Sequence, residues 1–280
     1  MKPVLMIHGG AGNRIPKNLN KTRQALKHIY EKSFKYLKTH SALEAVVYAV
    51  RLLEDCHFFN AGTGSKLQRD GKARMSASVM DGRHQKFCAV LNIENVKNPV
   101  QVATCLLHDH DSVLACHFAT QFAREKGFSS YNPVTAQRKK EWEEKRKISV
   151  YGTVGAVARD PKGHLASATS TGGKGFERLG RVSDSAMPAG NYANDKAAVS
   201  CTGMGEHIIN ESLANKIVVR VTDGLSLKQA FQKSFREVTH HKHEIGAIGV
   251  DWKGTVCLAH STPMMHTAYL NKQGKLVVLP

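Results

Sequence analysis

The chain has 280 residues, 41% of them hydrophobic, and 40 Lys and Arg against 23 Asp and Glu give a formal net charge of +17. This length suits one large domain with an ample core, and no apolar run approaches a membrane span. The short apolar start at residues 3–7 runs into glycines, unlike a signal peptide. We therefore expect a globular protein with no membrane partner.

The positive charge is spread along the chain rather than gathered in one arm. Basic surfaces can attract nucleic acid or other polyanions, but aromatic residues make up only 7% and no base-stacking motif is present. We expect no nucleic-acid partner. A non-catalytic basic binding protein is kept as the alternative from another functional class.

The six cysteines are scattered and form no C-x-x-C pair. This pattern favours free thiols in a reducing compartment, so we predict a cytoplasmic location. The spacing of Cys and His matches no zinc motif.

The first half of the chain alternates predicted strands and helices. Residues 2–7 predict a strand, and the glycines of 8–12 predict a turn with positive φ. Apolar residues recur at helical spacing over 20–38, and a capping box from Ser41 to Glu44 opens a helix over 41–55. The elements expected next are paired strands at 73–82 and 86–93 and helices at 98–110 and 111–127.

The second half begins after residues 129–150, a charged stretch without periodicity that we interpret as a flexible linker. The elements predicted beyond it are strands at 152–160 and 165–173, helices at 205–214 and 226–238, and strands at 245–252, 255–261 and 276–280. Helix pairs lying between blocks of hairpins predict an α+β fold, with antiparallel sheet between helices. No internal repeat is present, so 1–280 is expected to form a single domain.

Thr153 stands after Gly152, at the head of a strand that reads as buried. A threonine hydroxyl is a weak nucleophile unless a base lies beside it, and the α-amine of a chain-terminal threonine can be that base. Thr153 is internal, so this solution requires a cut between Gly152 and Thr153. The pair alone says little, because both residue types are common in such places.

Neighbouring motifs strengthen the hypothesis. "ATSTGG" supplies further hydroxyls, and "GRVSDS" places Arg181 three residues before Asp184, which we interpret as a fixed cation–anion pair. "SCTGMGE" offers the Thr202 hydroxyl and the Gly203 N–H as donors for an oxyanion.

Seven motifs occur in the order found in the plant-type asparaginases, also called isoaspartyl aminopeptidases or β-aspartyl peptidases: "IHGGAG", "FNAGTG", "VMDG", "GTVGAVA", "ATSTGG", "GRVSDS" and "SCTGMGE". The resemblance covers residues 3 to about 265. It implies the four-layer αββα sandwich of the N-terminal nucleophile hydrolases. It also implies self-cleavage into an α chain, 1–152, and a β chain, 153–280.

The resemblance implies roles for single residues. Thr153 is expected to attack the side-chain amide of asparagine or of a β-aspartyl dipeptide, with Thr171 orienting it. The expected oxyanion hole is Thr202 and Gly203, and the expected substrate-binding residues are Arg181 for the α-carboxylate, Asp184 for the α-ammonium, Gly205 and Asn60. No catalytic cofactor is expected.

Two further features follow from the resemblance alone. A structural sodium ion is expected on backbone carbonyls of the 53–63 loop, namely those of Leu53, Glu54, Cys56, Phe59, Ala61 and Thr63. A homodimer of αβ units is expected as the assembly. Related enzymes, a glycosylasparaginase or a threonine endopeptidase of the same fold, are alternatives, although the first is usually secreted and the second usually carries insertions.

Some positions depart from the family pattern. Ser183 replaces a glycine and would strain the loop if that glycine had positive φ. Ser76 stands where an acid is common, His57 where proline is usual, and Arg159 where a small or apolar residue is typical. The segment 258–269 matches weakly. None of these removes an expected catalytic group.

Overall fold

The computed structural model describes residues 1–13, 18–144 and 152–280, and within them the strands form two sheets. The eight-stranded sheet has the order β12-β11-β1-β5-β6-β2-β3-β4, and the four-stranded sheet has the order β10-β9-β8-β7. All neighbours are antiparallel except β3 and β4. The strands are β1 (Val4–Gly12), β2 (Met75–Asp81), β3 (Lys86–Ile93), β4 (Val113–Ala115), β5 (Val154–Arg159), β6 (Leu165–Thr171), β7 (Asn191–Ala193), β8 (Ala197–Gly203), β9 (Ile245–Asp251), β10 (Val256–His260), β11 (Met264–Leu270) and β12 (Leu276–Leu279).

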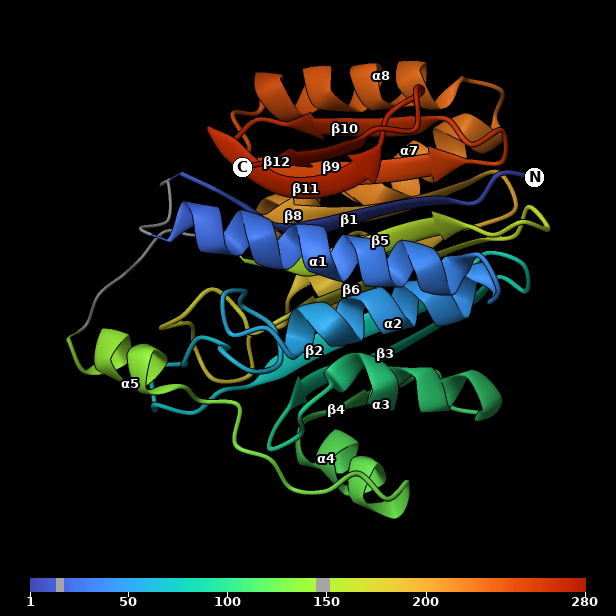
Figure 1. The fold of residues 1–280 in the computed structure, drawn as a ribbon. Coiled ribbons are helices and arrows are strands. Elements are labelled where there is room, and N and C mark those ends of the chain that lie inside the picture. Colours follow the sequence, from blue (N-terminus) through green and yellow to red (C-terminus); the bar gives the residue numbers. More distant parts are fainter. Residues whose placement is uncertain (14–17, 145–151) are drawn as a thin grey trace.

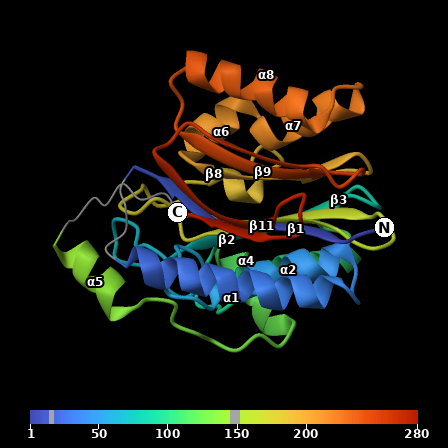
Figure 2. The same cartoon turned by 45° about the horizontal axis from the view of Figure 1, so that its top comes forward.

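Helices cover the outer face of each sheet, which gives four layers (Figures 1 and 2). On the large sheet lie α1 (Leu19–Leu37), α2 (Ala42–Glu54), α3 (Pro99–Cys105) and α4 (Cys116–Glu125). On the small sheet lie α6 (Gly205–Glu211), α7 (Leu213–Thr222) and α8 (Leu227–His240). The expected αββα sandwich is confirmed.

Apolar side chains fill the spaces between these layers. Met6, Val157, Leu165 and Met265 of the large sheet meet Ile248 of the small sheet in the core between the sheets. Both faces of β5 and β6 are therefore covered, and all their residues are buried. Any polar side chain on these two central strands lies inside the protein and needs a partner there.

Local sequence signals explain several boundaries. α2 begins at the predicted capping box, in which the Ser41 hydroxyl accepts from the Glu44 N–H and the Glu44 carboxylate accepts from the Ser41 N–H. α8 begins with a second capping box, formed by Ser226 and Gln229. The Asp81–Gly82 turn joins β2 to β3 as predicted.

The structure corrects four sequence-based predictions. β1 continues to Gly12, where a turn was expected. A β-bulge between His8 and Gly10, with φ of 115° at Gly10, accommodates an extra residue without ending the strand. Residues 113–115 form β4 instead of helix. Residues 213–222 form α7, and 264–270 form β11, neither of which was predicted.

The predicted linker 129–150 is also partly wrong, because α5 (Ala136–Glu143) lies within it. The Thr135 hydroxyl caps this helix, Arg138 donates to the Gly64 carbonyl, and the Trp142 indole donates to the Gln68 carbonyl. Long-range contacts therefore order a segment that has no apolar stripe. Residues 145–151 lie outside the described part of the chain.

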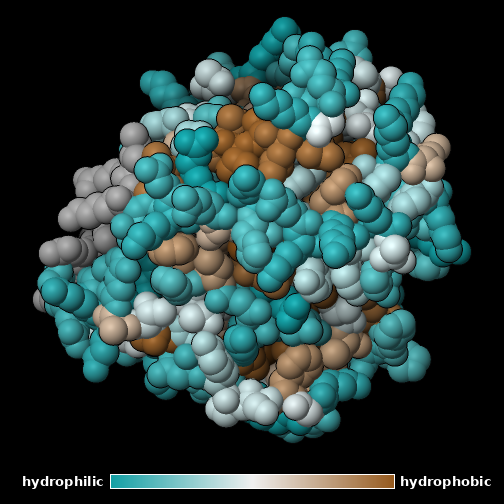
Figure 3. Space-filling model, viewed as in Figure 1, coloured by the Kyte–Doolittle hydropathy of each residue, from teal (hydrophilic) through white to brown (hydrophobic). Residues whose placement is uncertain are grey.

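The surface is mostly polar, but apolar residues gather over β10 and β12, the edge strands of the two sheets (Figure 3). The partly buried apolar residues of these strands are Val256, Cys257, Leu258, Ala259, Leu276 and Val278. All six cysteines are unpaired, as predicted. Over residues 1–13, 18–144 and 152–280, no helix has both the length and the apolar character that crossing a bilayer requires.

Arg159, one of the departures noted above, has a structural contact that explains it. Its guanidinium donates to the Trp252 carbonyl at 2.7 Å and to the Lys2 carbonyl at 2.8 Å. It therefore ties the end of β5 to the N-terminal segment and to the turn after β9.

Candidate active site

Thr153 lies at the head of β5 and is only 5% exposed. Its hydroxyl donates to Thr171 Oγ1 at 3.3 Å, and Thr171 Oγ1 also accepts the Gly173 N–H at 3.2 Å. Because β5 pairs directly with β6, the sheet itself sets the Thr153–Thr171 distance. The structure thus brings together the two hydroxyls that the sequence placed in one site.

Asn60 packs beside the bond expected to be cut. A Cβ atom on Gly152 would lie 2.6 Å from the Asn60 Cβ, so only glycine fits there. The Asn60 amide donates to the Gly173 carbonyl at 2.5 Å, and its oxygen accepts the Lys66 N–H at 2.8 Å. Asn60 therefore holds the backbone at Gly173 and at Lys66 beside the site. Its side-chain nitrogen and oxygen are both used in these two hydrogen bonds.

Behind Thr153 lies a buried polar chain that the sequence analysis missed. His8 Nδ1 contacts the Thr153 carbonyl at 3.1 Å, and His8 Nε2 contacts Ser200 Oγ at 2.8 Å. Ser200 also contacts Thr169 Oγ1 at 2.7 Å. A carbonyl only accepts, so Nδ1 carries the proton, Ser200 donates to Nε2, and Thr169 donates to Ser200.

This chain is electrically neutral. Complete burial lowers the pKa of His8 to about 3, although the bond to the Thr153 carbonyl acts in the opposite direction. Gly155 provides the space for it, since a side chain there would clash with both Ser200 and His8. The only sequence signal was a histidine directly after the predicted apolar strand 2–7, and buried histidines of that kind are commonly structural.

The His8 chain leads to a testable prediction about positioning. His8→Ala removes a partner from the buried Thr153 carbonyl and leaves the Ser200 hydroxyl with Thr169 alone, at about 1–3 kcal/mol for each group left unsatisfied. We expect a lower free energy of unfolding, slower cleavage before Thr153 and a lower kcat at nearly unchanged KM. Unchanged processing and kcat in a variant that has lost stability would assign His8 to folding alone.

Thr202 and Gly203 end β8 next to the bulge of β1. Thr202 Oγ1 accepts the Ala11 N–H at 3.1 Å, which leaves its own O–H proton available to donate. Gly203 has φ of 131°, a conformation reserved for glycine, and its Cα lies against the Glu244 carbonyl and Ile245. The bulge in β1 and the missing side chain at Gly203 let the end of β8 pack closely against β1 and the start of β9.

The expected pairing of Arg181 with Asp184 is wrong. Arg181 instead donates two hydrogen bonds to the Glu206 carboxylate, from Nε at 3.2 Å and from Nη2 at 3.1 Å. Lys174 contacts the same carboxylate at 2.7 Å. Glu206 lies in the first turn of α6, where a carboxylate is favoured by the helix dipole. The sequence did not identify this partner, because it lies 25 residues away from Arg181.

Asp184 is fully buried in the turn that follows. The Ser183 hydroxyl donates to its Oδ1 at 3.2 Å, whereas Oδ2 has no partner among the described residues. Glycines at 190 and 205 line the carboxylate, and a Cβ on either would crowd it. Burial raises the pKa of Asp184 to about 6, against the opposing effect of Arg181. An unpartnered buried carboxylate oxygen of this kind suits a ligand that brings a positive charge.

Ser183 causes no strain, contrary to the concern raised by its replacement of glycine. Its φ is −90° in extended backbone, and its hydroxyl caps the short 3₁₀ turn η2 (Asp184–Ala186). Ser76 is likewise accommodated, because its hydroxyl accepts the Asn92 N–H.

A chain of contacts links the two halves of the site. Ser76 pairs with Thr171 across β2 and β6, and the Asn92 side chain donates to the Arg181 carbonyl. The Ser78 hydroxyl donates to the Ser185 carbonyl. The segment that carries Arg181 and Asp184 is thereby fixed to the strand next to Thr171.

The 53–63 loop turns sharply around two glycines with positive φ, Gly62 and Gly64. A Cβ on Gly64 would lie 2.8 Å from the His57 carbonyl and 3.1 Å from the Phe59 carbonyl, so carbonyl oxygens gather inside the turn. The Glu54 carbonyl accepts the Thr63 N–H at 2.8 Å. The exposed His57 ring packs on Phe58, so its presence in place of proline leaves the loop interior intact.

The αββα sandwich with a buried threonine at the start of a central strand is the architecture of the N-terminal nucleophile hydrolases. Within that class the chain belongs to the asparaginase family, since the family model described as "Asparaginase" matches residues 1–279.

Curated relatives agree with this assignment. An isoaspartyl peptidase/L-asparaginase of Nostoc is 46% identical, with 96% of this chain and 92% of that protein covered. A plant-type L-asparaginase of Pyrococcus abyssi is 38% identical, with 96% of each covered. An isoaspartyl peptidase of Escherichia coli is 37% identical, with 96% of this chain and 92% of that protein covered.

The burial of Asp184 gives a prediction for stability against pH. Its folded-state pKa, about 6, lies above the ordinary 3.8, so folding favours the uncharged form. The stability this group contributes is complete below about pH 3.8 and is lost as pH rises through about 6. Two pKa units correspond to about 3 kcal/mol.

Asp184→Asn should therefore raise the free energy of unfolding more at pH 7.5 than at pH 4.5, because burial penalises only the charged carboxylate. Urea unfolding at both pH values, in an uncut Thr153→Ala background, measures the difference. The same dependence on pH with and without the substitution would contradict the assigned pKa.

Proposed function

We propose that the protein is a self-processing threonine hydrolase that converts β-aspartyl dipeptides and L-asparagine to aspartate. The observation that carries the proposal is the buried pair of Thr153, at the head of β5, and Thr171, at the end of β6. A chain of contacts through Ser76 and Asn92 connects this pair to the segment of Asp184, whose Oδ2 has no partner in the described part of the protein. The names of the relatives, isoaspartyl peptidase/L-asparaginase and plant-type L-asparaginase, refer to the same two substrate classes.

Maturation begins in the single chain. The Thr153 hydroxyl attacks the Gly152 carbonyl carbon, the C–N bond to Thr153 breaks, and Gly152 is left as an ester on Thr153 Oγ1. The nitrogen that leaves takes up the hydroxyl proton and becomes the free Thr153 amine. Water then hydrolyses the ester, which releases the α chain, 1–152, and restores the Thr153 hydroxyl. Asn60, packed against Gly152, and Thr171, beside the hydroxyl, support this assignment by fixing the geometry of the reacting residues.

The mature site then uses the same hydroxyl on the substrate. The Thr153 amine, with a pKa near ~8 for a chain terminus, takes the hydroxyl proton as Oγ1 attacks the side-chain amide carbonyl. Thr202 O–H and Gly203 N–H stabilise the oxyanion. The protonated amine donates to the leaving amine or ammonia, and water releases aspartate from the acyl-enzyme.

Substrate recognition uses the second half of the site. Arg181 binds the α-carboxylate of the substrate, which replaces the Glu206 carboxylate on the Arg181 guanidinium. The α-ammonium takes the unpartnered Asp184 Oδ2, and Gly205 leaves the room for both. A substrate without the ammonium would leave that carboxylate buried and unpaired, so it is rejected.

The Glu54 carbonyl lies beside Gly62 and the Phe59 carbonyl beside Gly64, and oxygen ligands of this kind suit a sodium ion because hard cations prefer them. We propose that Leu53, Glu54, Cys56, Phe59, Ala61 and Thr63 hold it through their backbone carbonyls. The ion has a structural role there, since it fixes the loop that carries Asn60. Loss of thermal stability on exchange of sodium for tetramethylammonium tests the assignment, and an unchanged melting temperature contradicts it.

We propose a homodimer of αβ units as the assembly and a cytoplasmic location. The apolar surface over β10 and β12 supports self-association, and the six free thiols support a reducing compartment. Light scattering during gel filtration tests the assembly, and a mass near 30.8 kDa contradicts the dimer.

The activity itself is tested with purified, processed protein and three substrates: a β-aspartyl dipeptide, L-asparagine and the same dipeptide with its α-amine acetylated. Aspartate release from the first two and none from the third is the expected result. Comparable rates with the acetylated dipeptide, or no release from any substrate by fully processed protein, would contradict the proposal.

A further inference from the structure

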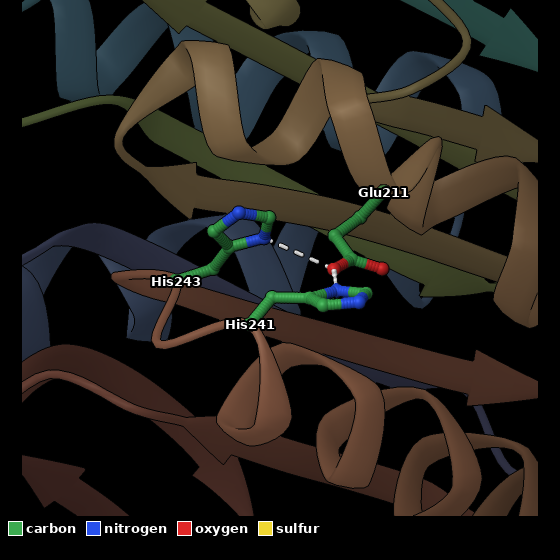
Figure 4. A group of neighbouring side chains, drawn as sticks. All are labelled: Glu211, His241 and His243. Atoms are coloured by element: carbon green, nitrogen blue, oxygen red, sulfur yellow. Dashed lines mark hydrogen bonds and ion pairs between the residues drawn. The ribbon is translucent and has the colours of Figure 1, made fainter.

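A cluster of Glu211, His241 and His243 lies on the small-sheet side of the molecule (Figure 4). Glu211 ends α6, and the two histidines follow α8. Each residue offers one ligand atom, and these three atoms lie within 4.8 Å of one another. Neither the proposed hydrolysis nor the core explains why they converge.

The backbone after α8 is shaped to present both histidines. Lys242 N–H bonds to the Thr239 carbonyl and His243 N–H to the Val238 carbonyl, the two bonds of a Schellman motif. Lys242 occupies the left-handed position with φ of 56°, which is normally given to glycine. This costs about 1–2 kcal/mol for a side-chain-bearing residue, so the conformation is held by its surroundings.

The two imidazole rings point at one carboxylate oxygen. His241 Nδ1 lies 2.6 Å and His243 Nδ1 lies 3.0 Å from Glu211 Oε1, and the sticks in Figure 4 converge on that atom. Tetrahedral zinc with bonds of about 2.0–2.1 Å needs ligand atoms about 3.3 Å apart. Both contacts reach that spacing with shifts of a few tenths of an ångström to about 0.7 Å, within reach of side-chain rotation.

Outer contacts orient Glu211. Its second oxygen, Oε2, is bound by Lys216, which also contacts Glu237 at 2.8 Å. Because Lys216 lies on Oε2, the other oxygen, Oε1, faces the two imidazoles and is free of the lysine to bind a metal.

We propose that Glu211 Oε1, His241 Nδ1 and His243 Nδ1 bind one Zn²⁺ ion, with water in the fourth position. Each ring binds as neutral imidazole, with the Nδ1 proton that faces Glu211 in the empty site moved to Nε2. Two imidazoles and a carboxylate are ligands that zinc accepts readily. His241 has a side chain 51% exposed, which leaves a path for the ion, while Glu211 is 4% exposed and holds the inner side.

The expected consequence is structural. The ion ties the end of α6 to the end of α8, and the other end of α6 carries Gly205 and Glu206 of the candidate active site. Met204, just before α6, is bound through its N–H to the Glu244 carbonyl, next to His243. Zinc should therefore raise the stability of this layer without entering the hydrolytic chemistry.

The test uses full-length Thr153→Ala protein, so zinc binding is measured whether or not the hydrolase proposal holds. The protein is stripped with a chelator and titrated with Zn²⁺ in competition with a chromophoric chelator, and with Co²⁺ for its visible absorption. We expect one tight equivalent per chain, a tetrahedral cobalt spectrum and a higher melting temperature with zinc.

His241→Ala and Glu211→Gln should weaken that equivalent by at least about tenfold, since loss even of an outer contact costs 10–100-fold. His84→Ala is the matched control, because His84 pairs with Asp81 at 2.7 Å as a single histidine–carboxylate pair. Circular dichroism without metal verifies that each variant is folded.

Absence of a tight equivalent in the parent protein would overturn the proposal. Equal zinc affinity in the His241→Ala and His84→Ala proteins would overturn it as well, because the ion would then bind elsewhere. His243→Ala gives an independent check should Glu211→Gln unfold.

Discussion

Thr153→Ala should leave the protein as one uncut chain and lower hydrolysis of a β-aspartyl dipeptide by about 10⁴-fold or more. The substitution removes the hydroxyl that donates to Thr171, and with it the only group proposed to attack both Gly152 and the substrate. Loss of a catalytic nucleophile in other hydrolases has effects of this size or larger. Denaturing gels and steady-state rates measure both consequences.

Thr153→Ser is the matched control, because it keeps the hydroxyl and loses only a methyl group. We expect cleavage to continue at a reduced rate and activity to follow it. An alanine variant that is cut and active like the parent would remove Thr153 from the mechanism.

Arg181→Ala should raise KM and lower kcat/KM by about 10²- to 10³-fold, while cleavage before Thr153 goes on. The loss corresponds to about 3–4 kcal/mol, within the cost of truncating one partner of a hydrogen-bonded charge pair. Processing is spared because it involves Gly152 and no substrate carboxylate. Kinetics on the processed variant separate the two effects.

Arg178→Ala is the control for that experiment, since Arg178 is exposed and lies three residues before Arg181. It should behave like the parent protein. Equal kinetics for the Arg181 and Arg178 variants would mean that another group binds the substrate carboxylate.

Much of the fold could be predicted from local signals, and the errors have a common cause. The capping box at Ser41 and the Asp81–Gly82 turn are local, and both were predicted correctly. α7 was missed because a run rich in β-branched residues is ambiguous between helix and strand; packing of Ile217 and Val218 on the small sheet decides it. α5 depends on distant carbonyl acceptors that no local pattern reveals.

The site shows the same division. Motif order led to Thr153, Thr171 and Asn60, and the structure brings these together. The Arg181–Asp184 pair was inferred from a three-residue spacing, but Arg181 turns to Glu206 on α6. Contacts across more than 20 residues, such as this one, depend on the assembled layers.

The cluster of Glu211, His241 and His243 was not predicted from the sequence for the same reason. His241 and His243 lie 30 and 32 residues from Glu211, so no short spacing announces them. Zinc motifs that are recognisable from sequence join Cys and His over short spacings, and this cluster contains no such motif. A carboxylate from another helix completes the cluster only once α6 and α8 are packed on the small sheet.

The central claim, a threonine nucleophile freed by self-cleavage, is tested most directly by intact mass and N-terminal sequencing of the purified protein. We predict two chains, 1–152 and 153–280, the second beginning Thr-Val-Gly-Ala. A single chain of 30.8 kDa that hydrolyses β-aspartyl dipeptides, or a cut at any other bond in an active preparation, would contradict it.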